Sequence, residues 1–257
     1  MNKTGHSFSI YLKKILYLIF AFVLISACSN NENELNTNAQ SPSTEPPHNK
    51  FKIALVMKTL TNPFFIEMEQ GARSAEKELG IQLSVKTAAQ ETSTQQQIAI
   101  VEDLIREKID AIVIAPGDSI ELIPVLKLAQ DNNIVVINID NRLDPTYSAK
   151  VGLSNIPYIS VNNEISAYNS TQELIKLIQK PTDVAIIEGI RGAGNAEDRK
   201  NGAIKAFSAS PFTNIVAMET ANWKIDEGFE VTKRIIEKKP TIGALFCAND
   251  MMALGAI

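Results

Sequence analysis

Short, almost wholly apolar runs alternate with longer amphipathic stretches from residue 51 to the end of the chain, and this alternation limits the possible folds most strongly. The apolar runs predict strands that are covered on both faces, as in a parallel sheet between two layers of helices. In the stretch 63–79, apolar residues recur at spacings of three and four, which predicts a helix with one buried stripe. The pattern is typical of a doubly wound α/β fold. The expected strands are 51–57, 81–87, 110–116 and 133–140, and the expected helices are 63–79, 94–108 and 119–131.

The same pattern then starts again, which predicts a second α/β unit. A further strand is expected near 149–153, and the boundary between the two units is expected near residues 154 and 155. The sequence therefore predicts an α/β fold of two doubly wound parallel-sheet domains, at 51–154 and 155–257. Because the chain stops where a new helix begins, we expect the second domain to be incomplete (truncated). Its expected elements are a helix at 157–180, a strand at 183–189, a helix at 196–208, a strand at 214–220, a helix at 225–238 and a strand at 242–248.

The first residues predict export rather than fold. A lysine-containing start precedes an unbroken apolar run at 15–25, and two small residues come directly before Cys28. The run is shorter than the ~20 residues that a spanning helix needs, so we expect 1–27 to be a signal peptide. The stretch LISAC resembles a bacterial lipobox, in which the cysteine receives lipid. The alternative is that Cys28 stands by chance beside an ordinary cleavage site.

Residues 28–50 are rich in Asn, Ser, Pro and Glu and have almost no large apolar groups, so we expect a disordered tether. The whole chain has a net charge of −4, which supplies no basic excess for binding nucleic acid. With Cys28 lipidated, Cys247 has no partner for an internal disulfide. Cys247 lies in an apolar strand, where a small core residue is a better interpretation than a nucleophile.

The residue content of the expected domains argues against catalysis. The chain's histidines, His6 and His48, fall in the signal peptide and the tether. The expected domains therefore lack the imidazole of Ser-His and Cys-His sites and of the usual histidine-ligated metal sites. No phosphate-loop or nucleophile-elbow motif occurs, and the glycines at 189, 192 and 194 do not match the dinucleotide-binding spacing. We expect a protein that is not an enzyme and uses no cofactor or metal.

Polar and aromatic residues gather at the expected carboxyl ends of strands, where ligands bind in open α/β sheets. A neutral sugar presents hydroxyl groups around its rim and C–H groups on its two faces. It calls for planar side chains that donate and accept hydrogen bonds, with aromatic rings above and below. Trp223, the only tryptophan, lies in a polar stretch, which favours a role as one of these ligand-contacting rings over a place in the core. The other candidates are Asn62, Phe64, Phe65, Asp140 with Asn141 and Arg142 beside it, Arg199, and Asn249 with Asp250.

Each of these residues also has a purely structural interpretation. Asn62 precedes Pro63 and can cap a helix, as can Asn249. Asp140 can form a turn. One of the two phenylalanines can belong to the core, and Arg199 can pair with a neighbouring acid on a solvated helix.

Four segments follow one another along the chain: IALVMKTLTNPFF, VVINID, AIIEGIRGAGNAEDRKNGA and FCANDMMALGA. In this order they resemble the periplasmic sugar-binding proteins of ABC transporters, in the ribose- and allose-binding group. The likeness extends from residue 51 to residue 257. It implies a type I periplasmic binding protein fold with two domains joined by a hinge, which closes on the sugar.

The resemblance also implies roles for residues in the first domain. Asn62 would bind ring hydroxyls, Phe64 and Phe65 would lie against one face of the sugar, and Asp140 would accept from hydroxyls. Lys58 stands where allose binders carry lysine and ribose binders a small hydroxyl residue. This favours an aldohexose such as allose over a pentose such as ribose.

In the second domain, the resemblance implies that Trp223 stacks on the opposite face of the sugar and that Arg199 and Asn249 donate hydrogen bonds. Two positions depart from the ribose-binding pattern: Asn141 and Glu197 stand where a ribose binder has arginine. The hydroxyl pattern that is read here therefore differs from that of ribose.

We thus expect a lipid-anchored solute-binding protein of the cell envelope, monomeric, that passes a monosaccharide to an ABC transporter permease. One alternative is a lipoprotein that presents the sugar to a signalling receptor. Another is the effector domain of a sugar-responsive repressor, which the N-terminus disfavours because it carries a lipobox in place of a DNA-binding helix pair.

Overall fold

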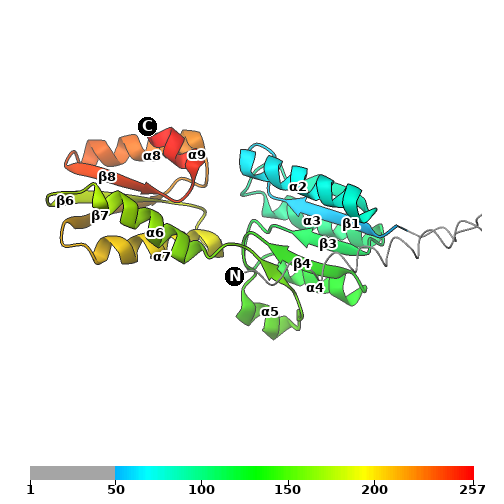
Figure 1. The fold of residues 1–257 in the computed structure, drawn as a ribbon. Coiled ribbons are helices and arrows are strands. Elements are labelled where there is room, and N and C mark those ends of the chain that lie inside the picture. The colour runs from blue at the N-terminus through cyan, green and yellow to red at the C-terminus, as the bar shows by residue number, and fades with distance from the viewer. Residues whose placement is uncertain (1–49) are drawn as a thin grey trace, which may run out of the picture. The chain divides into compact units, whose positions relative to one another are not determined.

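The computed structural model describes residues 50–257, which form two parallel sheets flanked by helices (Figure 1). The predicted signal peptide at 1–27, the proposed lipidation site Cys28 and nearly all of the predicted tether at 28–50 lie outside the described residues. None of the helices in the described part is long and apolar enough to cross a membrane.

The first sheet and its helices form the first lobe. Its strands run in the order β2-β1-β3-β4-β5, and every neighbouring pair is parallel. The strands are β1 Lys52–Met57, β2 Gln82–Thr87, β3 Ala111–Ile114, β4 Val135–Ile139 and β5 Tyr158–Ile159. The helices are α2 Pro63–Leu79, α3 Thr94–Arg106, α4 Ile123–Asp131 and α5 Pro145–Val151.

Successive residues of β1 pack against different helices, as the pleat of a strand requires. Ala54 and Val56 belong to an apolar cluster with α3 and α4, whereas Leu55 and Met57 pack with Phe65 of α2. Helices therefore cover both faces of the first sheet. This explains why its central strands are apolar throughout.

The second sheet and its helices form the second lobe. Its strands run in the order β7-β6-β8, again all parallel. Helices α8 and α9 lie on one face of this sheet and α6 and α7 on the other (Figure 1). The strands are β6 Thr182–Glu188, β7 Thr213–Thr220 and β8 Ile242–Cys247. The helices are α6 Asn163–Lys176, α7 Gly194–Ser208, α8 Ile225–Lys238 and α9 Asp250–Ala256.

The α/β fold with parallel sheets is confirmed, but the strand expected near 149–153 is wrong. That segment ends α5, which Asp144 caps by accepting from the Tyr147 amide at 2.6 Å, and which stops at Gly152 with a φ of 79°. The first sheet continues to β5, past the expected boundary between the two units near residues 154 and 155. The next helix begins at Asn163 rather than at 157, because Asn162 caps it through the Ile165 amide.

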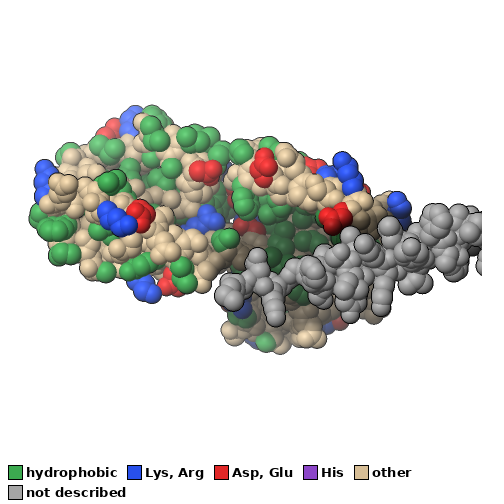
Figure 2. Space-filling model, in the orientation of Figure 1, with side chains coloured by type: hydrophobic (Ala, Val, Ile, Leu, Met, Phe, Trp, Pro, Cys, Tyr) green, Lys and Arg blue, Asp and Glu red, His purple; other side chains and the backbone are tan. Residues whose placement is uncertain are grey.

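Charged side chains are scattered over the face of the molecule that Figure 2 shows, among hydrophobic and neutral polar groups. On this face the lysines and arginines form no continuous patch. The visible surface therefore has no basic stripe of the kind that tracks a phosphate backbone.

Candidate functional site

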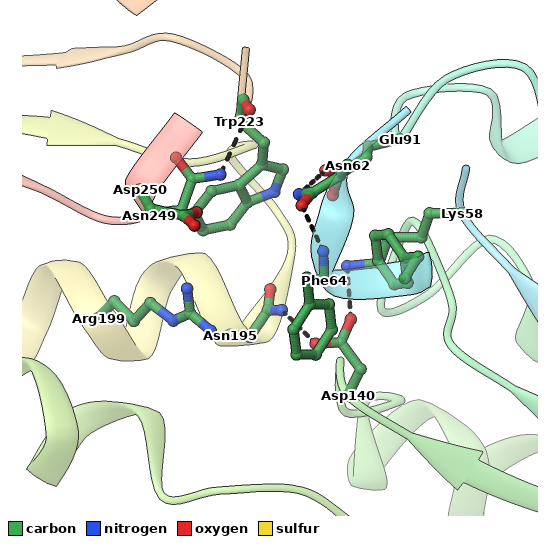
Figure 3. A pocket seen from close by; sticks show the side chains of 11 residues that line it. Lys58, Asn62, Phe64, Glu91, Asp140, Asn195, Arg199, Trp223, Asn249 and Asp250 are labelled. Atoms are coloured by element: carbon green, nitrogen blue, oxygen red, sulfur yellow. Dashed lines mark hydrogen bonds and ion pairs between the residues drawn. The ribbon is translucent and has the colours of Figure 1, made fainter. Parts of the chain in front are cut away.

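A cavity of about 170 Å³ lies where strands β1, β4, β6, β7 and β8 end (Figure 3). Parallel strands bring their carboxyl ends to the same edge of a sheet, so loops distant in sequence meet there. The first lobe lines the cavity with Lys58, Asn62, Phe64, Phe65, Glu91 and Asp140, and the second with Asn195, Arg199, Trp223, Asn249 and Asp250.

A buried ion pair forms one wall of the cavity. The Lys58 ammonium lies 2.8 Å from a carboxylate oxygen of Asp140, and their side chains are 2% and 9% exposed. Asp140 has a φ of 61°, a left-handed conformation that aspartate tolerates better than most residues. Its other carboxylate oxygen accepts from the Asn195 amide at 3.4 Å. The pair thus presents a fixed acceptor to the cavity.

Asn62 is held by two contacts within the protein. Its side-chain oxygen caps α2 by accepting from the Phe64 amide at 3.1 Å, and its Nδ2 donates to Glu91 at 3.0 Å. Burial raises the pKa of Glu91, and the nearby Lys58 opposes that shift. Glu91 was not among the residues expected from the sequence, because it lies in an irregular loop without any periodic pattern.

Aromatic rings from both lobes reach the cavity. Phe64 is 53% exposed, whereas Phe65 is only 2% exposed and packs into the core of the first lobe. The two rings meet edge to face, with centroids 5.1 Å apart. In the second lobe, Trp223 is buried, yet within residues 50–257 its indole nitrogen has no hydrogen-bond partner. This donor is available to a bound ligand.

A glycine makes room for the tryptophan. A Cβ atom at Gly189 would stand 2.1 Å from Cζ2 of Trp223, far inside contact distance. Trp223 itself has a φ of 67°, an unusual backbone conformation for a bulky residue. Strain of this kind persists only where the surroundings hold it, and it clusters at functional sites.

Polar groups of the second lobe complete the lining. The Arg199 guanidinium donates to Asn163 and to the Ala248 carbonyl, each at 2.8 Å, and lies 5.4 Å from the Trp223 ring. Burial lowers the pKa of Arg199. Asn249 caps α9 through the Met252 amide and donates to the Trp223 carbonyl at 3.3 Å.

Asn195, in the first turn of α7, was not among the expected residues. Its side-chain Oδ1 is buried without a hydrogen-bond partner in the described part of the chain. A buried acceptor without a partner is costly, and a ligand hydroxyl would satisfy it. Asn195 belongs to the motif GAGNAEDRK, whose spacing does not show which of its side chains faces the site.

Two expected residues, Asn141 and Glu197, do not line the cavity. Asn141 is fully buried: its Nδ2 donates to the Pro116 carbonyl and its Oδ1 accepts from the Asn195 backbone. Glu197 pairs with Lys200 on α7. Because both side chains are bound elsewhere in the protein, we withdraw them as direct ligand contacts.

The described residues contain no group of His, Cys, Asp and Glu that could hold a metal ion. Cys247 is half-buried beside the core of the second lobe, and burial raises the pKa of its thiol to about 11. The thiol is therefore protonated near neutral pH, which is unfavourable for nucleophilic attack. The cavity combines aromatic rings with fixed hydrogen-bonding groups.

Comparison with known proteins gives consistent matches. Residues 53–257 match the family model described as a periplasmic binding protein domain. The chain is 38% identical over 243 residues to the D-ribose/D-allose-binding protein of Pseudomonas aeruginosa, covering 93% of this chain and 73% of that protein. It is 32% identical to the D-allose-binding periplasmic protein of Escherichia coli, covering 79% of this chain and 65% of that protein.

A solved structure shares the fold. The crystal structure of an ABC transporter periplasmic solute-binding protein from Actinobacillus succinogenes, with bound D-allose, matches with a TM-score of 0.75 and 42% identity. The match covers 80% of this chain and 72% of that chain.

Proposed function

We propose, since the chain belongs to the periplasmic binding protein family, that it captures a neutral monosaccharide and delivers it to an ABC transporter. The family consists of substrate-binding transport proteins rather than enzymes. Relatives named for import and for ABC transport favour delivery to a transporter over presentation to a signalling receptor.

The single observation that carries the proposal is the composition of the cavity wall. Trp223 and Phe64 supply rings from opposite lobes, and the buried Nε1 of Trp223 and Oδ1 of Asn195 lack partners in the described residues. A polyhydroxylated ring satisfies both needs, because its C–H faces pack on aromatic rings and its hydroxyls donate and accept. The cavity volume of about 170 Å³ suits a ligand of one sugar ring.

We propose an aldohexose such as D-allose as the preferred ligand, with a pentose such as D-ribose as the second candidate. Lys58 supports this preference, because by the resemblance allose binders carry lysine at this position and ribose binders a small hydroxyl residue. Here the Lys58 ammonium is buried and paired with Asp140. Proteins named for binding D-allose are among the relatives, and one solved relative holds D-allose.

The proposed roles follow the contacts. Asp140 accepts from sugar hydroxyls, Asn195 accepts from another, and Trp223 and Phe64 contact the ring faces. Arg199 and Asn249 donate from the second lobe, and Lys58, Asn62 and Phe65 hold the first-lobe contacts in position.

Binding by hinge closure between the two lobes belongs to the same proposal. The expected bounds of 51–154 and 155–257 shift towards the C-terminus, because β5 Tyr158–Ile159 belongs to the first sheet. A sugar can favour the closed arrangement only by binding it more tightly than the open one. We also propose that the protein works as an exported monomer, held at the cell envelope by lipid on Cys28.

Titration of the full chain with D-allose and D-ribose tests the proposal. The only tryptophan lies in the cavity, so its fluorescence should change on binding, and calorimetry should give heat for the same sugar. D-Allose should bind more tightly than D-ribose. If neither fluorescence nor heat changes with any aldohexose or pentose, the proposed function is wrong.

A further inference from the structure

We propose that Glu91 is a specificity-determining residue of this cavity, whose ionised carboxylate positions Asn62 and favours uncharged sugars over acidic ones. The inference rests on the proposed function and concerns the same site. Glu91 lines the cavity together with Asn62 and Asp140.

Glu91 contacts Asn62 directly (Figure 3). Oε1 of Glu91 accepts from Nδ2 of Asn62 at 3.0 Å, while the oxygen of the same amide caps α2. Two contacts on one planar amide fix its orientation. The second oxygen of Glu91 accepts no hydrogen bond within residues 50–257, so it remains free for a sugar hydroxyl.

The loop that carries Glu91 is held in place by contacts with neighbouring segments. Gly117 permits a close approach, since a Cβ atom there would lie 2.9 Å from the Glu91 carbonyl oxygen. Earlier in the loop, the Ala89 amide donates to Gln96 at 2.8 Å, and Thr59 donates to the Ala89 carbonyl at 3.4 Å. The carboxylate is thus presented by a supported backbone rather than by a free loop.

Several charged groups surround Glu91. The charges of Lys58, Asp140 and Arg199 all influence its pKa, and Asp250 lines the same cavity. Lys224 and Asp226 line an adjoining hollow with Glu91, and Lys224 pairs with Glu227 at 2.9 Å.

The balance of these charges favours neutral ligands. Lys58 is already paired with Asp140, and Arg199 donates to neutral oxygens. With Glu91 ionised, the carboxylates of Glu91, Asp140 and Asp250 outnumber the cations Lys58 and Arg199 by one, and the lining then has a net charge of −1. A sugar acid would enter against this charge, whereas a neutral sugar would not.

Protonation of Glu91 should make the affinity for the sugar depend on pH. Burial raises the pKa of Glu91, so its carboxylate takes up a proton at a higher pH than an exposed glutamate does. Below that pKa the group is a weaker acceptor and the lining loses a negative charge. Affinity for a neutral sugar should therefore fall on acidification, and discrimination against acidic sugars should weaken.

The experiment compares the full-length wild type with Glu91→Gln by calorimetry, using D-allose and its uronic acid, D-alluronate, at neutral and at mildly acidic pH. Glu67→Gln is the matched control, since it removes the same charge from an exposed position on α2. Loss of a charge-assisted acceptor should weaken D-allose binding by Glu91→Gln about tenfold at neutral pH. The variant should also lose most of the pH dependence and bind D-alluronate relatively better.

The results that overturn the inference are distinct from failure of the proposed function. If the wild type binds D-allose but Glu91→Gln has the same affinity, pH profile and preference for D-allose over D-alluronate, the inference is wrong. A wild-type affinity that does not fall on acidification also overturns it, without reliance on the folding of any variant. If the wild type binds no sugar at all, the proposed function fails, and the inference fails with it.

Discussion

A lysine and an aspartate that are almost completely buried define the chemistry of the cavity at the scale of single residues. The Lys58–Asp140 pair is separated by 2.8 Å, and its energy depends on both partners being present. Removing each charge from water costs roughly several kcal/mol, and the attraction of the opposite charge offsets this cost. The ion pair therefore fixes the positions of the two side chains more than it adds to the stability of the folded protein.

Asp140→Asn should destabilise the protein by about 3 kcal/mol, because it leaves the Lys58 ammonium buried without its counter-charge. Asparagine suits the left-handed backbone at this position, so the loss is not a backbone effect. Urea unfolding measures the change. The double variant Lys58→Met/Asp140→Asn should recover part of the lost stability, and an equal or larger loss in the double variant would contradict the explanation.

The sequence predicted the site best where a residue directly follows a strand. Lys58, Asp140 and Asn249 stand at strand ends, so the α/β pattern alone places them at one edge of a sheet. Glu91 and Asn195 were missed because their side-chain directions depend on loop packing and on the first turn of α7, and no periodicity encodes either. Asn141 was misjudged for the same reason, since adjacent residues at a turn point in different directions.

At the scale of secondary-structure elements, α7 lacks an N-cap of its own. Ala193 stands at the cap position and offers no side-chain acceptor. Instead the Gly194 amide donates to the Ser119 hydroxyl at 2.9 Å, and the Asn195 amide donates to Asn141 at 3.1 Å. First-lobe side chains therefore satisfy amides that the helix leaves free, and they hold Asn195 beside Asp140.

Ser119→Ala should lower the free energy of unfolding by about 1 kcal/mol, the usual effect of losing a capping acceptor. Ser93→Ala is the matched control, because Ser93 precedes α3 without making a side-chain cap bond. Chemical denaturation of both variants measures the difference. Equal stabilities of the two variants would show that the Ser119 contact is not formed in solution.

The long helices were predictable from the sequence, whereas the connection between the lobes was not. The expected helices at 63–79 and 225–238 agree with α2 and α8 as observed, because each has a continuous apolar stripe. Helix α5 was mistaken for a strand, although Asp144 and Pro145 form a recognisable helix start. With only two residues, β5 is too short to give a pattern.

At the scale of the whole molecule, each lobe has its own hydrophobic core. One cluster joins β1, β3 and β4 to α3 and α4, and another fills the second lobe around β6. The cavity draws its lining from both lobes. A ligand that contacts both should therefore stabilise the native protein as a unit.

D-Allose at one hundred times its Kd should raise the free energy of unfolding by about 2.7 kcal/mol, through binding to the native state alone. Thermal unfolding with and without the sugar measures this as a higher Tm. Asp140→Asn, which loses the central acceptor, should show little or no rise. A rise of equal size in that variant would mean that D-allose stabilises the protein elsewhere.

The absence of a side chain at Gly189 limits how this cavity can change by substitution. A Cβ atom at Gly189 would enter the volume that the indole of Trp223 fills, so the sizes of the two residues are sterically coupled. A lineage that enlarges residue 189 must shrink residue 223 at the same time or displace it. A larger residue at 189 is therefore tolerated only together with a smaller residue at 223, and the single substitution at 189 leads through an overcrowded intermediate.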